Sequence, residues 1–344
     1  MDIKKVRTTK MVGWLFLVFI FMLTLVPSSA SQTADAGMEK LIEGAKKEGE
    51  VIYYASMNLE EIMALIPKFE KKYPFLKVKL VRTGGESLLN RLVSEYRAKK
   101  YLADVIQTLA FNMDTLRRGG ILGQYLSSED RFFQKGFKEQ GYWICSYCNT
   151  YVIAYNTKLV PRHHVPKTYE DLLTSRWKGK MMMDATKVDW FAGMLQIMGK
   201  EKGLKFMRDL SRQDISLRIG HALLAQLLTA GEGDLVIDIP TSSVERLKDK
   251  GAPIDWMALG PIPGVMIGIG IASHPPHPNA ARLFADFVVS KEGQTSLRDF
   301  GRNVVRSDIA QPAEYRGLTI VPVDPSLASH MNEYTELLRG IFSK

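Results

Sequence analysis

A Thr-Gly-Gly turn joins an apolar, strand-like segment to an amphipathic, helix-like segment within LVRTGGESLLNRL, residues 80–92. The dipole and the free N–H groups of a helix N-terminus favour negative charge, and glycine lets a ligand approach the backbone. The turn lacks the Lys-Ser/Thr pair of a phosphate-binding P-loop and the third glycine of a dinucleotide-binding turn. Thr83, Gly84 and Gly85 are therefore candidates for holding a small anion rather than a nucleotide.

Two cysteines, Cys145 and Cys148, occur in WICSYCNTYVIAYN, residues 143–156. In an exported protein this spacing could give a disulfide or a redox pair, but redox pairs lie at helix N-termini and this segment predicts a strand. An odd spacing along a strand points two side chains to opposite faces. We expect two buried, unlinked cysteines, or a local bridge at a bend, rather than catalysis.

Four of the six histidines occur in two pairs, His163-His164 and His274-x-x-His277. Histidine is a common metal ligand, so each pair is a candidate metal site. Both pairs lie in proline-rich segments that we expect to be surface loops, with no carboxylate or cysteine at ligand spacing. We predict no metal site and no resident cofactor. His221 differs, because it opens a predicted helix and could donate a hydrogen bond to an anion.

The sequence carries none of the short motifs typical of enzymes, such as G-x-S-x-G, H-E-x-x-H or a P-loop. We assign no catalytic residue and expect a binding protein rather than an enzyme.

The first 30 residues have the layout of a secretory signal peptide, with a basic start, an apolar run and small residues before a cleavage site at Ala30. An uncleaved anchor is the alternative, since the apolar run nears the length of a membrane span. Cleavage removes four bases and one acid and lowers the net charge from +9 to +6. This excess is spread along the chain, so we predict no nucleic-acid partner.

Strand-like and helix-like segments alternate after the signal peptide. EVIYYAS, KVKLVRT and ADVIQTL are separated by amphipathic segments, which predicts a doubly wound, mostly parallel α/β sheet. Ligands of such sheets bind beyond the carboxyl ends of the strands. These ends carry residues 56–58, 82–85 and 108–112. Asn58 and Glu61 have the spacing of a helix-capping pair.

Several segments resemble bacterial extracellular solute-binding proteins of ABC transporters. The resemblance rests on YNTKLVP, PKTYEDLLTSRWKGKM, HPNAARLFADFVVSKEGQTSL and FEKKYPFLKVKLVRTGGESLLNRLVSE, and it covers nearly all of the mature chain. It is strongest for the branch that contains ferric-iron, thiamine, polyamine and aminoethylphosphonate binders.

The resemblance implies a type 2 periplasmic binding protein fold with two α/β lobes, each a mostly parallel sheet flanked by helices. An N-terminal lobe would take residues 36–147 and 274–310, a C-terminal lobe residues 152–268, and residues 311–344 would form a tail packed on the lobes. Two hinge strands would cross near 147–156 and 266–273. The lobes would close on a ligand by a hinge motion.

This fold would bring turns from both lobes to one interdomain cleft. The candidate ligand-binding residues are Ser56, Arg82, Thr83, Gly84, Gly85, Thr108, Tyr147, Asp184, Thr186, Asp189, His221, Thr241 and Ser242. Converging helix N-termini favour a carboxylate, phosphonate or phosphate, to which an arginine could add a bidentate contact. Alternatives stay open: Arg82 as a solvated surface residue, Tyr147 and Trp190 as core, and Asp189 as a helix cap.

One departure concerns ferric iron. Ferric binders of this branch carry adjacent tyrosines where GDLVIDIPTSSVERL places Ser242 and Ser243, and neutral hydroxyls do not hold ferric iron unaided. Ser242 also fits a capping box with Glu245. We therefore expect a small anionic or zwitterionic solute, with ferric iron or a sensory role as alternatives. The resemblance implies a monomer in the periplasm that serves an inner-membrane permease and its ATPase.

Overall fold

The computed structural model describes residues 29–312 and 315–342 of the 344-residue chain. Two compact units are distinguished, residues 1–40 and residues 41–344. In the first unit the described residues belong to helix α1 (Ser29–Glu48), and the predicted signal peptide lies outside the described residues except for its last two positions. Within the described ranges no helix combines the length and the apolar character needed to cross a membrane.

A mixed sheet organises the second unit, with the strand order β2-β1-β3-β10-β5-β8-β6-β7. These strands are β1 (Glu50–Ala55), β2 (Lys77–Arg82), β3 (Val105–Leu109), β5 (Trp143–Asn156), β6 (Met181–Asp184), β7 (Ser216–Arg218), β8 (Leu235–Pro240) and β10 (Ile262–Ile271). The short strands β4 (Lys138–Glu139) and β9 (Ile254–Met257) pair with β5, and β11 (Ile320–Pro322) pairs with β10.

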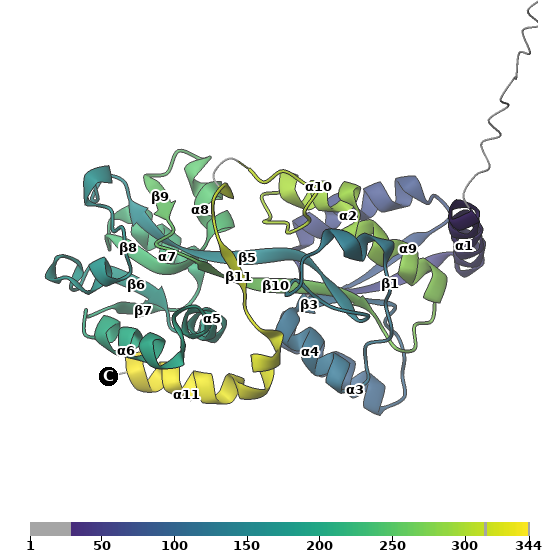
Figure 1. Ribbon diagram of the computed structural model, residues 1–344, viewed down its shortest axis with the longest axis horizontal. Helices are drawn as coiled ribbons and strands as arrows, with labels where there is room; N and C mark the ends of the chain where they lie inside the picture. Colours follow the sequence, from purple (N-terminus) through teal and green to yellow (C-terminus); the bar gives the residue numbers. More distant parts are fainter. Residues whose placement is uncertain (1–28, 313–314, 343–344) are drawn as a thin grey trace, which may run out of the picture. The chain divides into compact units, whose positions relative to one another are not determined.

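The sheet has two parallel sections joined by two long antiparallel strands. We call β2, β1 and β3 the N-terminal section and β8, β6 and β7 the C-terminal section, because the strands within each run parallel. Between them, β10 pairs antiparallel with β3 and with β5, and β5 pairs antiparallel with β8. Figure 1 shows β5 and β10 running between the two sections. The two predicted crossing strands therefore correspond to β5 and β10.

Helices cover both faces of each section (Figure 1). Around the N-terminal section they are α2 (Leu59–Lys72), α9 (Pro278–Val289) and α10 (Lys291–Asp299) on one face, and α3 (Gly85–Arg97) and α4 (Ala110–Arg118) on the other. Around the C-terminal section they are α5 (Val188–Met198), α6 (Lys200–Ser211), α7 (His221–Ala230) and α8 (Thr241–Lys248). Short 3-10 helices are η1 (Ser128–Phe132), η2 (Arg162–His164), η3 (Glu170–Leu173), η4 (Ser175–Trp177) and η6 (Pro325–His330).

The apolar face of each helix explains this layering. Ile62, Leu65 and Phe69 of α2 recur at helical spacing and are buried against β1 and α9. Leu88 and Leu92 of α3 do the same on the opposite face of β1 and β3. Two separate apolar clusters therefore pack on opposite faces of the strands of the N-terminal section.

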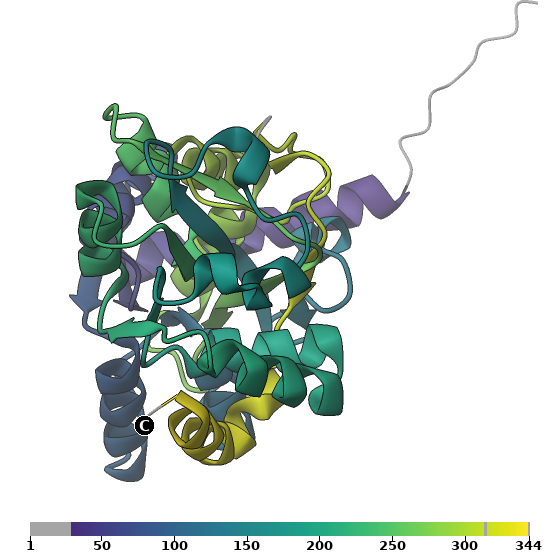
Figure 2. The same cartoon turned by 90° about the vertical axis from the view of Figure 1, so that its left-hand side faces the viewer.

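The last helix, α11 (Met331–Phe342), lies beside α5 and α6 in both Figure 1 and Figure 2. An ion pair of 3.1 Å between Lys200 and Glu333 joins α6 to α11. The side chain of Gln196 in α5 donates to the carbonyl of Pro322, 3.0 Å away. Helix α11 and the segment before it thus pack on the helices of the C-terminal section.

The segment from Pro278 onward forms two helices, because Ser290 adopts an extended conformation and its side chain caps α10 through the N–H of Gly293.

One local prediction, for the two cysteines, is wrong. Cys145 and Cys148 share one apolar cluster rather than opposite faces. The pairing of β5 with β10 shifts at Ser146, and such a bulge reverses the alternation of the side chains. Both cysteines are buried and unlinked.

Candidate functional site

The carboxyl ends of the N-terminal section bring several predicted residues together. The hydroxyl of Ser56, after β1, donates to the hydroxyl of Thr108 at 3.1 Å. A Cβ on Gly85 would lie 3.5 Å from the same Thr108 oxygen and 3.4 Å from the amide nitrogen of Asn112. The starts of α3 and α4 therefore meet at the end of β1.

Gly84 is the N-cap of α3 with an extended backbone that any residue could adopt, and a Cβ placed there would meet nothing within 4 Å. The space beside this helix N-terminus is thus open. The N–H of Thr83 donates back to the carbonyl of Ala55. Arg82 is exposed, and its Nε donates to the carbonyl of Met57 at 3.1 Å.

Asp184 organises the matching turns of the C-terminal section. Its Oδ1 accepts from the N–H and the hydroxyl of Thr186 at 2.9 and 2.6 Å, and its Oδ2 accepts from the N–H of Gly220 at 2.9 Å. The Nε2 atom of His221, at the start of α7, lies 4.0 Å from Oδ2. Both carboxylate oxygens of Asp184 therefore have partners within their own section.

The environment of His221 disfavours its charged form. Desolvation by burial, aided by the positive charge of Lys187 and opposed by Asp184, lowers the pKa of His221 to about 4. Beneath it, burial raises the pKa of Asp238 well above the usual value, although its oxygens accept from the N–H of Asp184. His221 is therefore neutral at pH 7.

A first hollow, which we call the Arg302 hollow, has a volume of about 470 Å³ and is lined from both sections. Its lining comes from the start of α2, from α8, from the end of α10 and from the following segment: Asn58, Glu60, Glu61, Ser242, Glu245, Arg246, Asp249, Arg298, Asp299, Phe300, Gly301, Arg302, Pro312 and Tyr315.

Arg302 lines this hollow and contacts side chains from three elements. Its Nη2 donates to Oε1 of Glu61 at 2.5 Å, and its Nη1 lies 3.3 Å from Oδ1 of Asn149 and 3.5 Å from the hydroxyl of Ser242. The guanidinium also lies 4.8 Å from the ring centroid of Tyr147. Burial raises the pKa of Tyr147 above the usual value, so the phenol is neutral. One arginine thus connects the start of α2, the strand β5 and the start of α8.

Two side chains that line this hollow keep polar atoms without hydrogen-bond partners, namely Nε of Arg302 and Oε2 of Glu61. Next to Arg302, both amide atoms of Asn303 are unpaired as well. Asn303 lines a separate recess of about 10 Å³ that Arg302 and Ser242 also line. Buried polar atoms in native proteins are nearly always hydrogen-bonded, so these unpaired atoms indicate that a polar group or a water belongs there.

A second hollow, the Asp189 hollow, has a volume of about 490 Å³ and opens on the other face of the sheet. Its lining is Glu86, Leu89, Leu109, Phe111, Asn112, Thr115, Thr186, Lys187, Val188, Asp189, Ala328 and Met331. The hydroxyl of Tyr151 donates to Oδ2 of Asp189 at 3.4 Å. Burial raises the pKa of Asp189 from its ordinary value, although Lys187 acts in the opposite sense.

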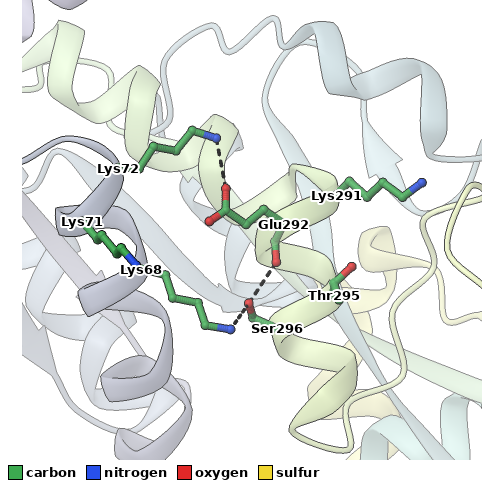
Figure 3. A pocket seen from close by; sticks show the side chains of 7 residues that line it. All are labelled: Lys68, Lys71, Lys72, Lys291, Glu292, Thr295 and Ser296. Atoms are coloured by element: carbon green, nitrogen blue, oxygen red, sulfur yellow. Dashed lines mark hydrogen bonds and ion pairs between the residues drawn. The ribbon is translucent and has the colours of Figure 1, made fainter.

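A third hollow, of about 610 Å³, lies between α2 and α10 and contains four lysines, as Figure 3 shows. Lys68 donates to the hydroxyl of Ser296 at 2.7 Å, and Lys72 pairs with Glu292 at 3.1 Å. This hollow takes no residue from the strand ends. We therefore regard it as a basic surface groove rather than part of the candidate site.

Of the remaining predicted residues, Thr241 and Trp190 are buried. The hydroxyls of Thr241 and Thr150 lie 2.6 Å apart and bind α8 to β5. Trp190 is 4 % exposed and belongs to an apolar cluster, which gives it a core role. The predicted capping box at Ser242 is wrong, since α8 begins at Thr241 and Glu245 instead accepts from the indole of Trp256.

The histidine pairs differ from expectation in one respect. His277 does have carboxylate neighbours, because its Nδ1 lies 2.8 Å from Oδ2 of Asp104 and its Nε2 lies 3.7 Å from Oε1 of Glu50. Both acids come from distant positions that spacing could not reveal. Within the described ranges, no group of three or more histidine, cysteine or acidic side chains gathers in a way that could hold a metal ion.

Sequence reasoning missed Arg302, Glu61 as its partner, Asn303 and Asp238. Asp238 had a detectable signal, since it is a lone acid within the apolar run LVIDIP. Arg302 had none, because it follows a helix in a segment without strand or motif character and gains its partners only through the fold.

A sequence-family model described as bacterial extracellular solute-binding protein matches residues 113–316, more than half of the chain. A comparison with curated proteins finds no match.

Among solved structures, iron-bound HitA from Pseudomonas aeruginosa is 20% identical, with a TM-score of 0.73 over 85% of this chain and 99% of that one. The Trichodesmium protein IdiA (FutA), in complex with iron and citrate, is 21% identical, with a TM-score of 0.74 over 86% and 100%. AfuA from Actinobacillus pleuropneumoniae, with bound fructose-6-phosphate, is 21% identical, with a TM-score of 0.67 over 85% and 97%. These likenesses confirm the predicted fold class, a two-lobed type 2 periplasmic binding protein fold.

Proposed function

The chain belongs to the bacterial extracellular solute-binding proteins, the solute-binding components of ABC importers, and from this premise we propose that it captures a small anionic or zwitterionic organic solute. The observation that carries the choice of ligand is Arg302, whose unpaired Nε lies among the starts of α2 and α8. A guanidinium beside helix N-termini favours an oxyanion. A zwitterion stays within the proposal because acidic side chains also line the Arg302 hollow.

The proposal assigns the two sections of the sheet to two lobes that close on the solute about β5 and β10. Residues 36–147 and 274–310 would form one lobe and residues 152–268 the other, with the tail from 311 packed on them. In support, Arg302 of the first lobe lies 3.5 Å from Ser242 of the second. Such a contact would break when the lobes open.

We also propose where the protein acts and with what. The signal-like start of the chain supports export to the periplasm as a monomer, which would deliver its solute to an inner-membrane permease driven by an ATPase. The role proposed is binding, without catalysis or a resident cofactor.

Ferric iron is the second candidate cargo, because two of the similar structures contain iron. Ser242 and Ser243 offer neutral hydroxyls, which are weak ligands for a hard trivalent ion. Other ligands would then have to come from elsewhere in the cleft.

The test is native mass spectrometry of protein that an expression host has exported from the full chain, followed by gentle denaturation. Release of an organic anion or zwitterion would support the proposal, and release of iron would favour the second candidate. If the protein is empty, a thermal-shift screen of carboxylates, phosphonates, polyamines and ferric citrate decides. No shift with any anion would refute the proposal.

A further inference from the structure

The unpaired atoms of the Arg302 hollow differ in kind. Nε of Arg302 is a hydrogen-bond donor, whereas Oε2 of Glu61 is an acceptor, and Glu61 is only 5 % exposed. The two side chains are already joined at 2.5 Å through Nη2 and Oε1. Any group that reaches one unpaired atom therefore lies close to the other.

A fully deprotonated anion cannot satisfy both atoms. It would accept from Arg302, but it would also meet the negative charge of Glu61, which is buried and therefore poorly screened. A plain cation would have the opposite problem. A single solute satisfies both atoms when it brings an acceptor and a donor side by side.

The small recess beside Arg302 strengthens this argument. Its volume of about 10 Å³ is close to what one water occupies, and Asn303 lines it with both amide atoms unpaired. One water there could satisfy Asn303. Glu61 does not line the recess and lines the larger Arg302 hollow instead. A water in the recess would therefore leave Oε2 of Glu61 without a hydrogen bond.

We propose that the solute carries a hydroxyl or ammonium group next to its anionic group, and that Glu61 recognises this donor while Arg302 binds the anion. This inference rests on the proposed function and narrows its ligand class. It assigns to Glu61 a role in specificity beyond pairing with Arg302. Anions without a proton to donate, such as sulfate and simple alkyl carboxylates, would lack the second contact.

The experiment is isothermal titration calorimetry of the exported full-length chain with matched probes. Lactate is compared with propionate, and 3-aminopropionate with butyrate, because all four carboxylates are fully ionised at pH 7 and the controls carry no donor. We expect the donor-bearing probe of at least one pair to bind about tenfold or more tightly, the size expected of a hydrogen bond to a charged group. Glu61→Gln should reduce that preference to about threefold or less.

Glu60→Gln is the matched control, because Glu60 lines the same hollow one residue away but is exposed. It should leave the preference unchanged. Should Glu61→Gln fail to fold, Glu61→Asp keeps the charge, withdraws the carboxylate by one methylene and should also weaken the preference. Equal binding within both pairs, or equal effects of the two glutamines, overturns the inference alone. If the wild-type chain binds none of the four probes but another anion shifts its melting temperature, the inference alone is overturned. If no anion in the thermal-shift screen shifts the melting temperature either, the proposed function is overturned as well.

Discussion

The Arg302 hollow and the Asp189 hollow have nearly the same volume, yet they treat buried charge differently. In the first, Arg302 and Glu61 pair directly, and their side chains are 12% and 6% exposed. In the second, Asp189 is held by the hydroxyl of Tyr151 and the N–H of Trp190. One hollow thus contains two compensating charges, whereas the other contains a carboxylate that burial pushes towards its neutral form.

This difference indicates how each hollow responds to change. A buried ion pair is insensitive to moderate pH but fails when one partner is removed, since the other charge is left uncompensated. A desolvated carboxylate or histidine tolerates a neutral substitution, but its stability contribution varies with pH. Neutral substitutions should therefore change the free energy of unfolding most at the Arg302–Glu61 pair. A change of pH should act mainly through Asp189 and His221.

The largest effect expected is that of Arg302→Gln. It leaves Glu61 buried without its partner, and we expect the free energy of unfolding to fall by about 3–5 kcal/mol. Chemical denaturation followed by circular dichroism measures this change.

Arg298→Gln is the matched control in the same hollow. Arg298 pairs only with the adjacent, exposed Asp299 among the ion pairs of the described residues, so the loss should stay below about 1 kcal/mol. If both variants lose a similar free energy of unfolding, the Glu61–Arg302 pair contributes no more to stability than an exposed ion pair.

The next effect is a pH dependence that originates at His221. Its pKa in the folded protein, about 4, lies below the ordinary value of 6.5, so unfolding takes up a proton between these two pH values. Stability should therefore rise with pH across this window and be lost as pH falls through about 4. The rise should amount to about 2–3 kcal/mol, from about 1.4 kcal/mol per pKa unit.

His221→Gln should remove this rise, as measured by denaturation at several pH values between 3.5 and 7.5. Only the difference between wild type and variant is diagnostic, since Asp238 and Asp189 contribute slopes of the opposite sign. His330→Gln, at a 60% exposed side chain, is the control and should leave the profile unchanged. Parallel profiles for wild type and His221→Gln would refute the assignment.

The contrast between the hollows also shows where sequence reasoning succeeds. The strand ends and helix starts followed from the apolar periodicity of segments such as EVIYYAS, because burial fixes which face each residue must occupy. Thr83, Thr108, His221 and Ser242 accordingly lie at strand ends or helix starts. Residues that follow a strand in the sequence can be predicted, since a parallel sheet collects its carboxyl ends at one edge.

The Arg302 hollow shows where sequence reasoning stops. Glu61 and Arg302 are 241 positions apart, and only the packing of α10 on α2 brings them together. The prediction that the two cysteines point to opposite faces was wrong for a local reason. A single extra residue at Ser146 reversed the alternation that their spacing implied. Long-range pairs and bulges depend on the whole fold, and no short pattern in this chain encoded them.

A smaller effect should follow Asp189→Asn. Burial raises the pKa of Asp189 above its ordinary value of 3.8, so the wild-type protein should lose stability as pH rises through that raised pKa. Asparagine keeps an oxygen for the hydroxyl of Tyr151 and carries no charge. We expect this fall to disappear and stability at pH 7 to rise by on the order of 1 kcal/mol.

Denaturation between pH 3 and 8 measures this effect. Asp249→Asn, at an exposed position in the Arg302 hollow, is the control and should leave the pH slope as it is. A loss of stability in Asp189→Asn at pH 7 would show that the carboxylate is held charged, which contradicts the contrast drawn between the hollows.

The smallest effect on stability should be that of Ser242→Ala. Its hydroxyl lies 3.5 Å from Nη1 of Arg302, a long contact that should change the free energy of unfolding by less than about 0.5 kcal/mol. If the hydroxyl contacts the solute when the lobes close, affinity for the released solute should nevertheless fall by roughly three- to tenfold. Ser243→Ala, one position along α8, should change neither quantity, because Ser243 does not line the hollow. Calorimetry with all three proteins separates the two roles. If wild type, Ser242→Ala and Ser243→Ala bind the solute with equal affinity, the hydroxyl of Ser242 does not contact the solute. Arg302 would then be the binding residue, and α8 would supply no side-chain contact through Ser242.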